Sequence, residues 1–335
     1  MQAFRALVLA ASVLTPSAAH ADVSLTPRFF LYFDNLAQRP EALDNIVGAQ
    51  PSLFVINGSI FGPNGPIPVT SQVTTTGSVA RSESIVYSMF GGSVSVDLDA
   101  EKNWQLTVSG MRGKGKSDFE AVQSFRRDAR IGNLVAVDIA DVSISGRINF
   151  KRTDLEATLQ RRLNENVALL GGVRLEQVRA NGAGFGTVSE SQNAILVLQS
   201  LLGFPPPDSL VPRIVNASQS GRNTTDLLSG RIGIATNAQL TSRDVVFANL
   251  MAHYDYGLKD QGAISDIRTG QVFKFKRGRA SQIGPDLIVG FNHSFSEKIS
   301  VDVRYRATVY VPLNQTSSNE PIVSHGLNLG VTLRI

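Results

Sequence analysis

A histidine and an aspartate stand two residues apart in the alternating segment 246–256. Tyr254 separates His253 from Asp255, and side chains two apart on an extended strand point to the same face. A carboxylate beside an imidazole can fix the ring's tautomer, which is how a general base is oriented in many hydrolases. A polar pair at the rim of a sheet, without a catalytic role, explains the two residues equally well. His253 and Asp255 are therefore a candidate rim pair.

Charged side chains recur on the polar faces of the other alternating segments. In segment 299–311, for example, Asp302, Arg304 and Arg306 alternate with apolar residues. Across the chain this alternation places seven arginines and five carboxylates on such faces: Arg28, Asp97, Asp154, Glu156, Arg162, Arg174, Glu176, Arg231, Asp302, Arg304, Arg306 and Arg334. One interpretation is a set of ion pairs that fills an interior, because a lone buried charge is costly. The other is a charged constriction that selects small solutes.

Short polar turns join these segments in pairs. Four turns separate runs with a period of two, which is the signal of β-hairpins, and they fall at residues 99–103, 164–166, 241–244 and 296–298. Much longer connections link the hairpins, at residues 35–84, 114–147, 180–226, 258–284 and 312–324. With an opening strand at 24–34 and a closing strand at 325–335, the count is about ten strands. Connection 35–84 has room for another hairpin, so eight or twelve strands stay open.

The apolar face of each segment predicts contact with lipid. Segment 299–311 is apolar on one side and charged on the other, and the chain ends on a face-forming residue, Ile335. Nothing after residue 21 approaches the ~20 apolar residues of a spanning helix. Strands with open edges cannot exist in hydrocarbon, so the pattern predicts an all-β fold, a closed antiparallel transmembrane β-barrel.

The first 21 residues predict export. A basic start, an apolar stretch and a small-residue cleavage site at Ala19-His20-Ala21 are typical of a signal peptide. We expect residues 1–21 to be removed and residues 22–335 to form one barrel domain. The chain has no cysteine, which excludes disulfides and thiol-ligated metals. Its formal charge of +4 comes without a basic stripe, so nucleic acid is not an expected partner.

The chain resembles bacterial outer-membrane β-barrel proteins, and its end is similar to their C-terminal assembly signal. Gly330, Leu333 and Ile335 fit that signal, whereas Leu329 occupies its polar position and Ile335 replaces its terminal aromatic residue. The resemblance implies a Gram-negative outer membrane, short periplasmic turns and long extracellular loops. It also implies contact with outer-membrane lipid and lipopolysaccharide, and with the barrel-assembly machinery during biogenesis.

Two further segments invite comparison with enzymes or with a plug. Surface proteases of the omptin type place Asp and His at the rim, but the paired aspartates of that family have no counterpart beside His253. In Asn292-His293-Ser294 the His and Ser are adjacent, so they face opposite ways, unlike in outer-membrane lipid hydrolases; His293 is interpreted as structural. The apolar run 194–202 predicts a helix. It is expected against the barrel mouth or in the outer leaflet, or as a plug or partner-binding helix.

The favoured function is a porin-like passive channel for small solutes. The alternative is a surface interaction or structural barrel whose long loops bind a partner, and an outer-membrane hydrolase is the third possibility. No catalytic residue, cofactor site or metal site is predicted, and the protein is not expected to be an enzyme. Val303 lies on the apolar face of segment 299–311 and Thr308 on the opposite face. We therefore expect Val303→Arg to destabilise the barrel more than Thr308→Arg.

Overall fold

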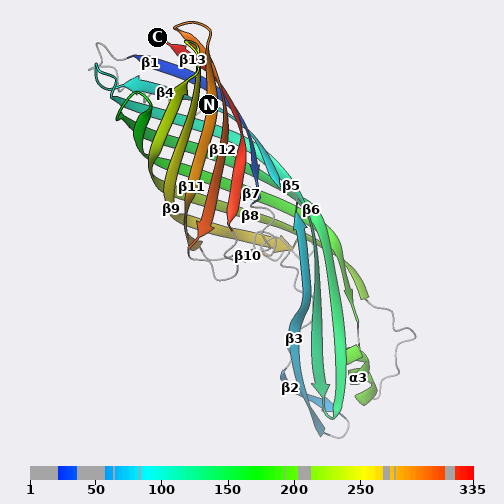
Figure 1. Ribbon diagram of the computed structural model, residues 1–335. Coiled ribbons are helices and arrows are strands. Elements are labelled where there is room, and N and C mark those ends of the chain that lie inside the picture. Colours follow the sequence, from blue (N-terminus) through cyan, green and yellow to red (C-terminus); the bar gives the residue numbers. More distant parts are fainter. Residues whose placement is uncertain are drawn as a thin grey trace.

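The protein is an antiparallel β-barrel that carries a long β-extension at one end (Figure 1). The computed structural model describes residues 22–35, 57–62, 65–82, 84–191, 193–202, 213–266, 272–274, 277–313 and 321–335. The expected signal peptide lies outside these residues, so the domain boundary at residue 22 stays a prediction. No helix in the described part of the chain is long and apolar enough to cross a membrane.

Ten strands form a closed ring of hydrogen-bonded neighbours. Their order is β4-β1-β13-β12-β11-β9-β8-β7-β6-β5, and β5 pairs back to β4. Every pairing in the ring is antiparallel. The ring strands are β1 (Val23–Asp34), β4 (Ile85–Asp97), β5 (Trp104–Ile131), β6 (Leu134–Arg162), β7 (Val167–Glu190), β8 (Arg213–Gln239), β9 (Asp244–Asp266), β11 (Arg277–Ser294), β12 (Ile299–Pro312) and β13 (Ile322–Arg334). The predicted ten-stranded antiparallel barrel is confirmed.

The four predicted short turns lie together at one end of the barrel. Their side chains supply the hydrogen bonds that the backbone lacks there: the Asn164 carboxamide oxygen accepts from the backbone N–H groups of Asn166 and Val167. The start of β1 and the end of β13 meet at the same end, where the Ile335 backbone N–H donates to the Val23 carbonyl. Both ends of the ring therefore lie on the short-turn side, as an even strand count requires.

At the opposite end the strands continue far beyond the barrel. Strands β5 and β6 are 28 and 29 residues long, and a two-residue turn at Gly132-Asn133 joins them. Gly132 has φ +59°, which the first central position of a type II′ hairpin turn requires. Since a membrane-crossing strand needs only ~9–11 residues, more than half of each strand lies outside the barrel wall.

The prediction of long loops was therefore largely wrong. Connection 114–147 is strand except for its turn, and the flanks of connections 180–226 and 258–284 are strand as well. Backbone pairing between neighbours continues past the barrel, so these segments keep their hydrogen bonds within the sheet. Their Gly residues and charges resembled loop composition although the period of two persists.

The extra hairpin allowed by connection 35–84 exists but does not enter the ring. It consists of β2 (Asn57–Gly62) and β3 (Gly65–Ser82), and β3 pairs with the outer part of β5. A short strand, β10 (Val272–Lys274), pairs with the end of β9. The barrel therefore keeps ten strands, and the added strands widen the extension.

The predicted helix is present as α3 (Asn193–Leu201), but its predicted position was wrong. It packs near the outer end of the β5–β6 hairpin rather than at the barrel mouth (Figure 1). Ala194 lies in an apolar cluster with Val69, Ile131 and Ala136. The Ala194 backbone N–H donates to the carboxylate of Asp138 on β6, which satisfies one free amide of the first helical turn. An apolar helix needs an apolar partner, and the tip of the hairpin supplies one.

The outer wall of the barrel carries an exposed apolar belt. Val303, Leu250 and Leu329 are 41%, 50% and 48% exposed, as expected for side chains that face lipid. On β6 the belt lies between two outward-facing cations, Arg161 at the short-turn end and Lys151 at the other end. The Arg161 guanidinium lies 5.3 Å from the centre of the Trp104 ring. A ten-residue span of a tilted strand rises roughly 25 Å, the height of the apolar band of outer-membrane barrels.

Candidate functional site: the charged lumen

The layer nearest the short turns is built around Asp302. Arg28 on β1 donates through Nη1 and Nη2 to the two carboxylate oxygens of Asp302 on β12, each at 3.0 Å. Arg304 donates through Nε to Oδ1 at 3.0 Å, and its guanidinium lies 5.1 Å from the Phe247 ring. One carboxylate thus joins two cations from neighbouring sides of the lumen. Asp302 has no exposed surface.

The middle layer is built around Asp286. Arg306 donates through Nε to Oδ1 at 3.0 Å and through Nη2 to Oδ2 at 2.6 Å. Thr308 Oγ1 donates to Oδ1 at 3.0 Å, and Arg231 pairs with Oδ2 from the other side. Arg231 and Arg306 also share Glu156, and the Arg306 Nη2–Glu156 Oε2 distance is 3.5 Å.

This middle layer crosses the full width of the barrel. Arg306 is on β12 and Glu156 on β6, and four strands lie between them in either direction around the ring. The pair is therefore a diameter of the lumen, formed by direct contact between opposite walls. Side chains from opposite walls of the barrel therefore meet at that level.

The layer nearest the extension is built around Arg152 on β6. Its Nη2 donates to Glu176 at 3.0 Å, its Nε to Asp154 at 3.1 Å and its Nη1 to Asp34 at 3.4 Å. Arg174 pairs with Asp154 at 2.9 Å and with Glu176 at 2.7 Å. The Arg152 side chain is 1% exposed, and three carboxylates compensate its charge and that of its neighbour.

Aromatic residues close this upper layer. The Tyr310 hydroxyl on β12 accepts from Arg174 Nη1 at 3.3 Å, which links two walls separated by three strands. Arg152 lies over the Tyr32 ring, with 4.4 Å to the ring centroid. Beyond Tyr32 an apolar cluster with Ile85 and Tyr87 begins and continues along the inner face of the extension.

The predicted pair of His253 and Asp255 exists, but it is buried in the lumen wall. The His253 Nδ1–Asp255 Oδ1 distance is 3.0 Å, and Nε2 lies 3.1 Å from the Val309 carbonyl oxygen. Pro285, which has no N–H, lies where the β11–β12 pairing is interrupted, and the imidazole reaches the Val309 carbonyl oxygen there. The pair is expected to face the lumen near its extracellular mouth, and in the structure it lies in the lumen with His253 and Asp255 4% and 1% exposed. With both ring nitrogens engaged, His253 has none to offer a substrate.

Nine of the twelve predicted lumen residues meet in these three layers, and three do not. Asp97 is partly exposed and accepts from Gln105 Nε2 at 2.9 Å. Arg162 and Arg334 are exposed at the short-turn end. The alternation of side chains predicts which side of the sheet a residue is on. It does not predict the position of these three residues along the barrel axis.

Three essential members were missed: Asp34, Arg152 and Asp286. Asp286 lies one position before the apolar run that identified its strand, so extending the alternation by one residue would have found it. Arg152 stands where β6 enters the extension, next to the segment 114–147 that the sequence pattern predicts as a loop. Asp34 lies in the predicted opening strand, six residues after Arg28, and therefore on the same face of that strand.

His293 has the structural role expected of it. Its Nδ1 lies 2.7 Å from Asp244 Oδ1, and its ring packs against Phe295 at a centroid distance of 4.7 Å. The hydrogen bond from His293 is the main cause of a pKa below the usual value for Asp244, which lies at a short turn outside the apolar belt. His293 thus links the neighbouring turns at residues 241–244 and 296–298.

The chemistry of the lumen is that of a compensated ionic core. Each buried guanidinium of the three layers contacts at least one carboxylate. Within the described ranges, no cluster of three or more His, Cys, Asp or Glu residues has the arrangement of a metal site. The geometry favours structural ion pairs over a hydrated, selective constriction.

Comparisons with known proteins reveal similarity of architecture only. No family model matches the chain, and neither does any curated protein sequence. Among solved structures, the outer membrane protease OmpT from Escherichia coli has a TM-score of 0.41 at 9% identity, covering 94% of this chain and 96% of that one. The translocator domain of autotransporter NalP from Neisseria meningitidis has a TM-score of 0.31 at 10% identity, covering 100% and 95%. An outer membrane channel from Pseudomonas putida F1 has a TM-score of 0.25 at 11% identity, covering 95% and 97%.

These structures include a protease, a translocator domain and a channel, and at such identities they carry no argument about activity.

Proposed function

We propose that the chain is an integral outer-membrane barrel with a sealed lumen, and that its β-extension is a binding structure on the cell surface. The apolar belt supports the membrane placement, since exposed apolar side chains around a whole barrel require lipid. Short turns at one end and the extension at the other support an extracellular position for the extension. This is the surface-interaction alternative from the sequence.

The observation that carries the proposal is the contact between Arg306 and Glu156 across the barrel diameter. Together with the layers above and below, it fills the lumen with paired charges at three heights. A ten-stranded barrel lies close to the eight-stranded size at which side chains alone fill the interior. A solute would have to separate buried ion pairs in order to pass.

The porin-like passive channel predicted from the sequence is the contrasting proposal. The charged lining supports it, because rings of charge select ions in channels. It requires water between the charged groups, whereas Asp302 and Thr308 have no exposed surface. We therefore rank it second.

Planar-bilayer recording of the refolded protein tests the proposal. The wild type should show no stable conductance. The double variant E156A/R306A should show conductance steps, because it removes the diametric pair and leaves Arg231 paired with Asp286. The matched control R162A/R334A changes exposed charges at the periplasmic end and should stay silent. Stable, ion-selective conductance of the wild type would overturn the sealed-lumen proposal in favour of the channel.

A further inference from the structure

Three cations form a row across three strands on the outer face of the extension. Lys114 on β5 is paired in register with Lys151 on β6, and Lys151 is paired with Arg179 on β7. All three side chains are exposed. By alternation they share the face of the apolar belt, four residues above Leu155 and Leu175 on their strands. This basic row is the first charged row that the outer face presents above the belt on β6 and β7.

The three cations of the basic row have no ion-pair partner among the described residues. No described carboxylate forms an ion pair with Lys114, Lys151 or Arg179, although like charges in direct cross-strand pairs repel. Two acidic side chains on this face have other hydrogen-bond partners. Asp118 receives a two-pronged hydrogen bond from Arg147, and Asp226 accepts from Gln177. Uncompensated cations in a row at a membrane surface call for an external anion.

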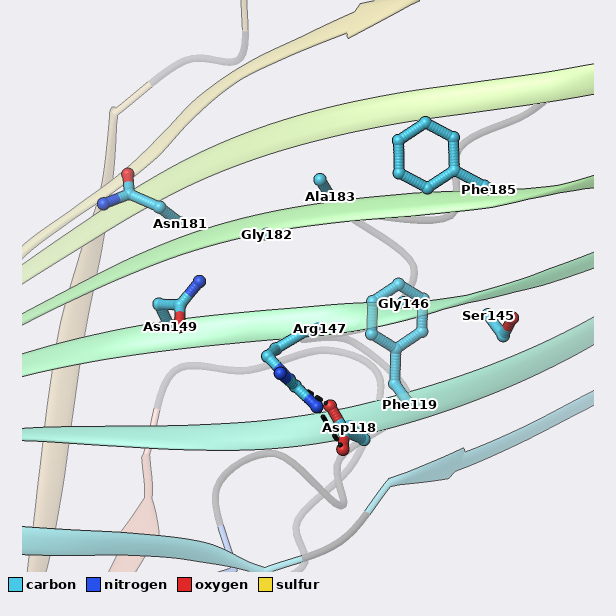
Figure 2. Close-up of a pocket in the computed structure, with 10 residues that line it drawn as sticks. All are labelled: Asp118, Phe119, Ser145, Gly146, Arg147, Asn149, Asn181, Gly182, Ala183 and Phe185. Atoms are coloured by element: carbon cyan, nitrogen blue, oxygen red, sulfur yellow. Dashed lines mark hydrogen bonds and ion pairs between the residues drawn. The ribbon is translucent and has the colours of Figure 1, made fainter.

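A pocket of about 670 Å³ adjoins the row on the side away from the belt (Figure 2). Asn149 and Asn181 line it and lie two residues beyond Lys151 and Arg179. Gly146 and Gly182 also line it, and the backbones of β6 and β7 approach so closely there that a Cβ on Gly146 would lie 2.2 Å from the Ala183 carbonyl oxygen.

The pocket walls suit a carbohydrate. Figure 2 shows Asn149 and Asn181 on adjacent strands, Arg147 directed at Asp118, and Phe185 farther along β7. Carboxamides offer donors and acceptors that match the hydroxyls of a sugar. Phe185 is 63% exposed and presents a flat apolar ring for the C–H face of a pyranose. An isolated exposed Phe would need no explanation, but this one lines a polar pocket beside a cationic row.

We propose that the basic row and this pocket together bind the headgroup of a phosphorylated glycolipid in the outer leaflet, such as lipopolysaccharide. The cations take the phosphates, the pocket takes a sugar, and the acyl chains lie on the apolar belt directly below. The inference rests on the proposed outer-membrane placement, because only there do belt, row and pocket meet a lipid at these heights.

Equilibrium binding of purified lipopolysaccharide to the full-length protein in detergent tests this inference. The variant K114Q/K151Q/R179Q should bind about 100-fold more weakly, from the usual contribution of three cations at an anionic lipid surface. The control R130Q/R243Q/K298Q removes the same charge at exposed positions on the outer tip and the short turns, and it should bind like wild type. Equal weakening of both variants, or of neither, would overturn the proposal.

Two further arms identify the ligand. Dephosphorylated lipopolysaccharide should bind wild type and K114Q/K151Q/R179Q with similar, weak affinity, and inorganic phosphate alone should not compete at equal concentration. The variant F185A/N149A should weaken binding of both lipid forms by a similar factor, since it removes sugar contacts. Full competition by inorganic phosphate would mean a simple anion site and would refute the glycolipid. Bilayer conductance is recorded separately, so failure of the sealed-lumen proposal is distinguishable from failure of this one.

Discussion

Asp286→Asn should be among the most destabilising conservative changes in the barrel. The carboxylate is 1% exposed and compensates Arg231 and Arg306 while accepting from Thr308. Asparagine keeps the volume but removes the charge, and its amide group points two donors at groups that are themselves donors. Breaking one side of a buried ion pair typically costs ~3–5 kcal/mol, and the remaining contact with Glu156 places the expectation at the lower end, ~3 kcal/mol.

Asp128→Asn is the matched control. Asp128 also pairs with an arginine, Arg126, with an Nη2–Oδ1 distance of 2.9 Å, but the two side chains are 47% and 50% exposed. An exposed pair contributes at most ~1 kcal/mol, so this variant should stay close to wild type. Urea unfolding in detergent, followed by the shift between folded and unfolded bands on unheated gels, measures both. A loss below ~1 kcal/mol for Asp286→Asn would refute the view that the lumen is a dry ionic core.

Other predictions concern the two faces of the wall and the extension. Val303→Arg should destabilise the barrel by ~2–4 kcal/mol, because the side chain faces the middle of the apolar belt. Thr308→Arg should be at least as damaging, contrary to the milder effect expected from the sequence, because Thr308 is fully buried beside Asp286; the same unfolding assay decides between the two. The hydrogen bond from Arg147 lowers the pKa of Asp118 from its usual 3.8, so the pair stabilises the fold above that value and loses its effect as the pH falls through the lowered pKa. The difference in melting temperature between wild type and Asp118→Asn should therefore be constant from neutral pH to about pH 5 and vanish in stronger acid.

The barrel itself could be predicted because two local signals coincide in it. Period-two alternation gave the facing of residues such as Arg306 and Val303, and polar turns such as the one at Asn164 fixed the hairpins. Closure then follows from the absence of open edges in lipid. The partners within the lumen could not be predicted in this way. Arg306 and Glu156 are far apart in the chain and meet only because the ring has ten strands of a particular stagger.

The extension was missed for a reason that can be read along β6. Below Arg152 the outward residues are apolar, as at Leu155 and Leu159, and the inward residues are charged. Above it the assignment inverts: Phe150 and Ile148 are buried on the inner face, and Lys151 is exposed on the outer one. A strand is recognised in the sequence by apolar residues at every second position. At Arg152 the apolar residues move to the other set of positions, so the pattern stops there and the next segment is predicted as a loop.

The inversion marks the level at which the outer face of the sheet leaves lipid for water. Within the belt, lipid requires apolar groups outside, so charges can be placed only in the lumen, where they must pair. Above the belt, water accepts charges outside, and the inner face can then be apolar and bury itself, as Phe119 does on β5. The same switch occurs on β7 between Glu176, which faces the ionic lumen, and Val178, which packs on the apolar cluster. The neighbouring strands β6 and β7 thus change at nearly the same height, and the basic row lies just above that line on the outer face. The proposed glycolipid site is therefore located by the inversion itself: it lies where the wall stops being solvated by acyl chains and begins to meet headgroups.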